Sequence, residues 1–188
     1  MTGHALPSVR LEPMSEAEFR ESLHRSVLRH AADYVRRGYW TEARSVEAME
    51  KEFAHLLPNG RETPDHSFAH VVDDASGQRV GETWYQAREQ GGKVRFWVDW
   101  IAIDPEHRRK GYATATLLRL EEAATRCGAD RIGLGVWLDN PGAVALYEKL
   151  GYAPTNLWMM KSLGRVRGPN DAGSGRIGSN RPRARRTS

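Results

Sequence analysis

Apolar residues recur at steps of three and four through the first third of the chain, which is the spacing of one face of a helix. Ser15 and Glu18 form a capping-box pattern, so a first helix is predicted to begin there and to end at Gly38. Its apolar stripe is formed by Phe19, Leu23, Val27, Ala31, Tyr34 and Val35. A second helix is predicted from Thr41 to residues 58–60, with a stripe formed by Val46, Met49, Phe53 and Leu56.

The hydrophobic period changes to two at His66. Three segments follow this two-residue period, at residues 66–74, 79–87 and 93–103, and tight turns separate them. This pattern predicts an antiparallel meander of three strands. Other elements are predicted as strands at 8–14 and 131–138, helices from Ala113 to Cys127 and from Pro141 to Leu150, and a last strand around 157–163. This order predicts a mixed α/β (α+β) fold, with a mostly antiparallel central sheet and helices on both faces.

The charge is unevenly distributed along the 188 residues. Residues 164–188 carry seven arginines and one acid, Asp171, and removing that +6 from the formal +4 leaves about −2 for the rest. This segment is also rich in Gly, Ser and Pro, so we expect a disordered basic tail. A solubilising role for it is favoured over a nucleic-acid tether. The predicted organisation is a flexible N-terminus at 1–8 and a single domain at 9–163.

The chain begins without a signal-peptide pattern, and no stretch approaches the roughly 18 apolar residues of a membrane span. We therefore expect a cytoplasmic protein with no membrane partner. Cys127 is the one cysteine, which excludes an internal disulfide and a cysteine metal cluster, and its place beside an apolar stripe predicts a buried thiol. His66 and His70 would lie roughly 13 Å apart on a strand, too far to share a metal ion, so no metal is expected.

Three cations, Arg108, Arg109 and Lys110, precede Gly111 at the start of a predicted helix. Free N–H groups and the helix dipole make such a start attractive to anions, and cations there are unfavourable unless an anion binds. A glycine also allows the backbone to approach a ligand closely. The pattern predicts a phosphate site, although it contains neither a Walker loop nor G-x-G-x-x-G.

The segment "RRKGYA" resembles the R/Q-x-x-G-x-G/A pyrophosphate loop of the GNAT superfamily of acyl-CoA N-acyltransferases, with Arg108, Gly111 and Ala113 at the defining positions. The resemblance extends over residues 94–152 and includes Asn140, Tyr147 and a closing Gly-Tyr pair. Alanine at the last loop position departs from the commoner glycine, but the family accepts it.

The resemblance implies a GNAT fold that binds acetyl-CoA or another acyl-CoA. The pyrophosphate is expected on the loop and the helix start, and the pantetheine arm on the backbone of the preceding strand. In the family a bulge on that strand opens the gap for the thioester, but a bulge is not visible in a sequence. The expected cofactor contacts are Ile101, Ala102, Ile103, Arg108, Arg109, Lys110, Gly111, Tyr112, Ala113, Thr114, Asn140 and Tyr147.

Transfer to an amine needs a neutral amine and a proton for the leaving thiolate. For a lysine-like amine the neutral form costs about 4.6 kcal/mol at pH 7, so a base is valuable. Asp99 and Glu82 stand in otherwise apolar strands and are the candidate bases, water or no base being the alternative. The two-residue period places Asp99 on a face with Trp97 and Ile101. By resemblance Tyr147 is the general acid, and a core tyrosine is the alternative.

The sequence therefore predicts an N-acetyltransferase that acts by direct attack in a ternary complex. The alternatives are a catalytically silent acyl-CoA sensor and an RNA-associated enzyme tethered by the arginine tail, a nucleic-acid partner being disfavoured. The acceptor is a small-molecule or peptide amine, and a homodimer is possible by family habit. Trp84, Trp97 and Trp100 are predicted to pack in the core, with an aromatic wall for the acceptor as the alternative.

Overall fold

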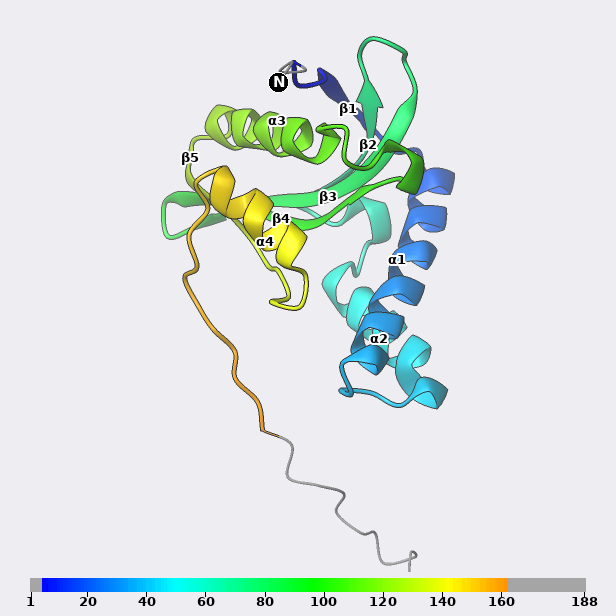
Figure 1. Cartoon of the computed structure of the whole chain (residues 1–188). Coiled ribbons are helices and arrows are strands. Elements are labelled where there is room, and N and C mark those ends of the chain that lie inside the picture. The colour runs from blue at the N-terminus through cyan, green and yellow to red at the C-terminus, as the bar shows by residue number, and fades with distance from the viewer. Residues whose placement is uncertain (1–4, 162–188) are drawn as a thin grey trace, which may run out of the picture. The chain divides into compact units, whose positions relative to one another are not determined.

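The computed structural model describes residues 5–161 (Figure 1). The predicted elements appear in their predicted order up to the last helix. They are β1 (Val9–Pro13), α1 (Glu16–Arg36), α2 (Glu42–Leu56), β2 (His66–Asp73), β3 (Arg79–Gln90), β4 (Lys93–Ile103), α3 (Tyr112–Arg126), β5 (Ala129–Leu134) and α4 (Pro141–Lys149). Short 3₁₀ turns at Gly60–Glu62 and Pro105–His107 complete the set. Residues 1–4 and 162–188 lie outside the described residues. The expected basic tail at 164–188 falls wholly in the second of these ranges, and the expected flexible N-terminus at 1–8 falls partly in the first.

One five-stranded sheet runs in the order β1-β2-β3-β4-β5. The pairs β1–β2, β2–β3 and β3–β4 are antiparallel, and β5 is parallel to β4. The prediction of a mixed, mostly antiparallel sheet is confirmed. The helix α3 connects β4 to β5, so the loop at the end of β4 leads into the first turn of α3.

Helices cover both faces of the sheet, as predicted (Figure 1). Trp84 of β3 packs with the apolar residues of α1 and α2, whereas its neighbour Tyr85 packs with α3. Successive strand residues point to opposite faces, so the apolar alternation builds two cores. The α3 core contains Phe96, Val98 and the fully buried Leu120.

The first helix begins as predicted. The Ser15 backbone N–H donates to Glu18 Oε2 at 2.8 Å and the Glu18 N–H to Ser15 Oγ at 3.4 Å, a complete capping box. The stripe of α2 is rotated from the predicted one, because Val46 and Leu56 are exposed and Ser45 is buried beside Met49. The small Ser45 fits there because its hydroxyl donates to a carbonyl one turn back, at 3.0 Å.

The C-terminal prediction needs correction. The chain divides at Pro154 into a second unit, whose described residues 154–161 form no helix or strand, so the strand expected around 157–163 is absent from 157–161. A run of apolar residues forms a strand only where the backbone of a neighbouring strand pairs with its N–H and C=O groups. β5 likewise ends at Leu134, not at residue 138. Cys127 is exposed rather than buried, since α3 ends at Arg126.

Candidate active site

A β-bulge interrupts β4 at Asp99. Trp100 lies opposite Trp84 and Val98 lies opposite Tyr85, so Asp99 is an extra residue with no partner in β3. The last pair between β4 and β5 is Val98 with Leu134. Beyond the bulge, the second edge of β4 therefore pairs with no strand among residues 5–161. A bulge of this kind bends a strand and re-aims a side chain.

Asp99 lies on the α1 and α2 face, where the Gln86 side-chain amide donates to both of its carboxylate oxygens at 3.0 Å. Burial raises the pKa of Asp99 to about 6, and the Gln86 hydrogen bonds only partly oppose this rise. Ile101 packs in the opposite core, with α3. The prediction that Ile101 shares a face with Asp99 is wrong, because the extra residue at the bulge shifts the alternation by one.

Glu82, the other candidate base, is held in an ion pair. Its carboxylate accepts a hydrogen bond from the Arg25 guanidinium of α1 at 2.8 Å, and its side chain is 11% exposed. In the described part of the chain, Asp99 forms no ion pair of this kind. Two carboxylates that look alike in the sequence thus differ in charge compensation.

The predicted phosphate loop has a backbone suited to an anion. Arg109 and Gly111 have positive φ angles of 63° and 91°. Backbone turns of this type direct successive N–H groups to one side, and the first N–H groups of α3 add to them. Gly111 is the N-cap of α3 and supplies no capping side chain. A Cβ on Gly111 would also lie 3.0 Å from Pro7. Both the positive φ angle and the lack of space for a side chain therefore favour glycine at this position.

Arg108 ties this loop to the end of β4. Its Nε donates to the Ile103 carbonyl at 2.9 Å, and its side chain leaves two terminal nitrogens free of that bond. The Ile103 carbonyl therefore already accepts a hydrogen bond from Arg108. The sequence analysis did not distinguish Ile103 from Ile101 and Ala102 as a backbone contact for the pantetheine arm. The loop cations Arg109 and Lys110 are exposed.

The residues predicted on the last helix lie in and before α4. The Asn140 side chain accepts a hydrogen bond from the Ala143 N–H at 3.3 Å and caps α4 ahead of Pro141. Tyr147 is partly buried, its ring centroid lies 5.9 Å from that of Tyr152, and burial raises its pKa. A phenol with a raised pKa stays protonated at neutral pH. Asp99, Glu82 and Tyr147 are therefore carried by three different elements.

The three tryptophans have different surroundings. Trp84 is buried with Phe53 and Phe68, and its indole donates to His66 at 2.8 Å, so the core prediction is confirmed for it. Trp97 is 44% exposed. Trp100 is partly buried, 4.7 Å from the His30 ring. The described residues contain no group of three or more His, Cys, Asp or Glu placed to hold a metal ion.

The sequence did not reveal a bridge between the end of α1 and the loop before α4. Arg37 donates to Asp139 at 2.8 Å, and its guanidinium lies 4.3 Å from the ring centre of Trp137. These residues are about 100 positions apart, and no local pattern connects them. Gln86 was also missed, although the two-residue period places it on the Trp84 face.

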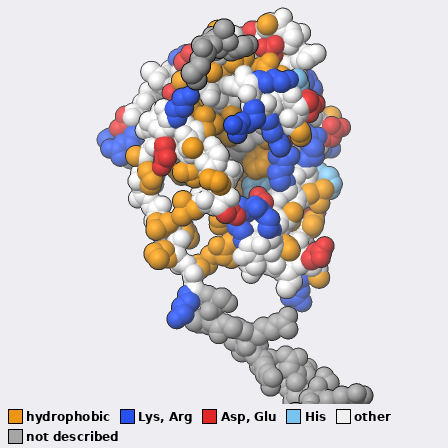
Figure 2. Space-filling model, viewed as in Figure 1, with side chains coloured by type: hydrophobic (Ala, Val, Ile, Leu, Met, Phe, Trp, Pro, Cys, Tyr) orange, Lys and Arg blue, Asp and Glu red, His pale blue; other side chains and the backbone are white. Residues whose placement is uncertain are grey.

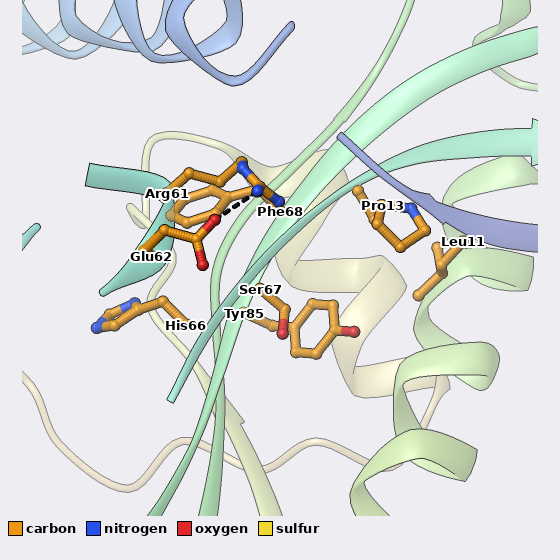
Figure 3. Close-up of a pocket in the computed structure, with 9 residues that line it drawn as sticks. Leu11, Pro13, Arg61, Glu62, His66, Ser67, Phe68 and Tyr85 are labelled. Atoms are coloured by element: carbon orange, nitrogen blue, oxygen red, sulfur yellow. Dashed lines mark hydrogen bonds and ion pairs between the residues drawn. The ribbon is translucent and has the colours of Figure 1, made fainter. Parts of the chain in front are cut away.

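Two cavities border the sheet. One of about 310 Å³ lies between α1 and the ends of β3 and β4, and it is lined in part by Glu82 and Arg108. The other, of about 240 Å³, lies along the β1 and β2 edge (Figure 3). Figure 3 shows Arg61 paired with Glu62 on one side of this second cavity and Leu11 with Pro13 on the other. β4 does not line it, so the first cavity is the one adjoining the candidate site.

The surface around the candidate site is basic. Figure 2 shows Lys and Arg side chains gathered over α1 and the loop between β4 and α3, next to a hollow with hydrophobic atoms at its floor. An electropositive rim of this kind attracts anionic ligands.

In the part of the chain that is described, no helix is long and apolar enough to cross a membrane.

A mixed sheet in which β4 and β5 stop pairing at a bulge, followed by a helix that begins at a basic glycine loop, is the arrangement that the sequence resemblance implied for an N-acyltransferase. A family model described as "Acetyltransferase (GNAT) family" matches residues 29–152, so the chain belongs to the GNAT family. It is 35% identical over 153 residues to the uncharacterized N-acetyltransferase YdgE of Bacillus subtilis, covering 81% of this chain and 97% of that one.

Another B. subtilis relative is the uncharacterized N-acetyltransferase YycN, 30% identical over 158 residues, with 83% of this chain and 99% of the relative covered. A crystal structure of the putative acetyltransferase YycN superposes with a TM-score of 0.78 at 29% identity, over 84% of this chain and all of that one. A putative acetyl transferase from Pyrococcus furiosus superposes with a TM-score of 0.63 at 24% identity, over 83% of this chain and all of that one. The GNAT fold predicted from the sequence is confirmed.

Proposed function

We propose that the protein transfers an acetyl group from acetyl-CoA to a primary amine, by direct attack within a ternary complex. The observation that carries this proposal is the bulge at Asp99. Beyond it, one edge of β4 pairs with no strand within residues 5–161, and a carboxylate of raised pKa lies at the bulge itself. Membership of the GNAT family supports this class of reaction, and the bulge is the observation that supports its location.

The donor acetyl-CoA is held by backbone more than by side chains. The N–H groups from Arg109 to Ala113, with Thr114 next to them, take the pyrophosphate, because a left-handed turn and a helix start both present free donors there. Arg108 and Lys110 add positive charge. The backbone of Ile101 and Ala102 pairs with the amides of the pantetheine arm in the manner of an added strand. Tyr112 and Asn140 border this path.

Asp99 acts as the general base for the acceptor. With a pKa of about 6, the carboxylate is about 90% ionised at pH 7 yet much more basic than an ordinary aspartate. It takes a proton from the bound ammonium group, directly or through one water, and leaves a neutral amine. The amine nitrogen then bonds to the thioester carbonyl carbon, and the carbon–sulfur bond breaks as the tetrahedral intermediate collapses. The nitrogen gives up its extra proton to solvent as the amide forms, and a proton from solvent replaces the one that Tyr147 donates to sulfur.

Tyr147 supplies the proton that the departing thiolate needs. Burial raises the pKa of its phenol, so the hydroxyl remains a proton donor across the physiological range. Glu82 is assigned a structural part, because its charge is already balanced by Arg25. This division of labour leaves one proton acceptor and one proton donor at the site.

The test of this function is CoA release from acetyl-CoA with a panel of primary amines, comparing the natural protein with Tyr147→Phe. Removing the hydroxyl is expected to slow turnover by about 10² or more, since general acid catalysis typically contributes that much. CoA affinity, measured by calorimetry, should remain within about twofold. A fully active Tyr147→Phe protein would refute the acid assignment. Tight CoA binding with no acetylation of any amine would indicate the sensor instead.

A further inference from the structure

The cavity between α1 and the ends of β3 and β4 is lined by an unusual number of cations. Its volume is about 310 Å³, and four arginines from three segments line it. Arg25 and Arg29 come from α1, Arg79 begins β3, and Arg108 begins the phosphate loop. The carboxylates that line it are Glu82 and Asp104, so the lining carries a net charge of about +2.

Two of these four arginines already have a counter-ion. Arg25 donates to Glu82 at 2.8 Å, and Arg79 to Glu18 at 2.6 Å. Arg29 and Arg108 form no ion pair with any described residue. The Arg29 guanidinium carbon lies 5.1 Å from the ring centre of Trp100, and Arg108 uses only its Nε, on the Ile103 carbonyl. Two guanidiniums thus keep donors available at one cavity.

A buried imidazole adjoins these arginines. His70, on β2, is 8% exposed and lines the same cavity. Its Nε2 atom forms no hydrogen bond within residues 5–161 but faces Glu18 Oε1 at 3.5 Å, so a carboxylate already lies beside it. The free guanidiniums of Arg29 and Arg108 are therefore the groups that point to a ligand with acceptor oxygens. Guanidinium groups match carboxylate and phosphate oxygens in a bidentate geometry.

We propose that this cavity is an anion subsite for the acceptor, which binds a carboxylate or phosphate group of that substrate through Arg29. The inference rests on the proposed function, since the acceptor is one of its two substrates. The enzyme then acetylates amines that also carry an acid group. A phosphate of CoA is the competing occupant, and its binding in the cavity would overturn the proposal.

The experiment measures the binding of inorganic phosphate at constant ionic strength, by calorimetry. Phosphate is titrated into the free protein, into its complex with CoA and into its complex with dephospho-CoA. Three proteins are compared: the natural chain, Arg29→Gln, and Arg20→Gln as a matched control from the exposed side of α1, where Arg20 pairs with Glu16. CoA and dephospho-CoA both occupy the loop at the start of α3, so the complexes isolate the cavity.

Arg29→Gln is expected to weaken phosphate binding by about tenfold or more, the loss expected for a charge-assisted hydrogen bond, and Arg20→Gln by less than about twofold. Phosphate binding that persists in the CoA complex assigns the subsite to the acceptor. Binding that persists only in the dephospho-CoA complex shows that the CoA 3′-phosphate occupies the cavity, and it overturns the acceptor subsite. Arg29→Lys keeps the charge and should recover part of the affinity, and thermal unfolding shows whether each variant is folded.

Equal phosphate binding by Arg29→Gln and the natural chain in all three forms overturns the proposal, as does the absence of phosphate binding to the natural chain. The titration of the free protein needs no catalysis and no CoA. A protein that fails to bind CoA but shows the Arg29-dependent phosphate site would refute the proposed function and keep the anion subsite. An acetyltransferase that lacks the Arg29 effect would do the reverse.

Discussion

Two carboxylates on the same face of the sheet have opposite surroundings. Glu82 on β3 is paired with Arg25, whereas Asp99 at the β4 bulge accepts hydrogen bonds from the Gln86 amide, forms no ion pair within residues 5–161 and has a pKa near 6. Charge compensation makes the first a structural ion, and its absence lets the second exchange a proton near neutral pH. Both stand in apolar strands, so the bulge and the missing cation distinguish them, not the strand pattern.

The largest expected effect comes from neutralising Asp99. Asp99→Asn removes the proton acceptor, so kcat should fall by about 10² to 10⁴, the usual contribution of a general base. Affinity for CoA should change little, because no predicted CoA contact is altered. Steady-state kinetics with acetyl-CoA and an accepted amine measures the fall. Glu82→Gln, the matched comparison, should lose less than about tenfold, and a greater loss there than in Asp99→Asn would reverse the two assignments.

Removing the counter-ion of Glu82 should act on stability. Arg25→Gln leaves a carboxylate that is only 11% exposed without its cation, so unfolding free energy should drop by about 1–3 kcal/mol. Chemical denaturation at pH 7 measures the drop. Arg20→Gln removes an exposed pair on the same helix and should stay within about 0.5 kcal/mol of the natural chain. Equal effects of the two variants would show that the Glu82 pair is not structural.

Neutralising Asp99 should have the opposite effect on stability. Its folded pKa of about 6 lies above the ordinary value of 3.8, so between these values the folded state binds more protons than the unfolded one. The natural protein therefore loses stability as pH rises from about 4 to 6, and the deficit persists above pH 6. Asp99→Asn removes it and should be about 1–2 kcal/mol more stable at pH 7.5, with no gain at pH 4. A variant less stable at pH 7.5 would contradict the raised pKa.

The sequence predicted most of the fold because the periodicity of its apolar residues is local. The capping box at Ser15, the meander from His66 and the α4 cap at Asn140 each depend on residues within a few positions. The phosphate loop was found for the same reason, since its cations and Gly111 are consecutive. The strand expected at 157–163 failed in its described part because an apolar pattern does not specify a partner edge.

The features of the site that were missed depend on distant contacts. The bulge at Asp99 arises from how β4 registers against β3, and the residues flanking it form a nearly continuous apolar run that gives no sign of an extra residue. The pairing of Arg37 with Asp139 joins helix and loop across about 100 residues. The difference between Asp99 and Glu82 likewise depends on which side chains approach from other elements. Rules based on neighbouring residues in the sequence do not predict which side chains from distant elements come into contact.

The central claim is that Asp99 is the proton acceptor of an acetyltransferase. Its most direct test is the pH profile of kcat/KM for the natural protein and Asp99→Asn, with one amine acceptor. The natural protein should show a rising limb with an apparent pKa near 6, and Asp99→Asn should lack it at a much lower rate. An Asp99→Asn enzyme with the same limb and an unchanged rate would contradict the account.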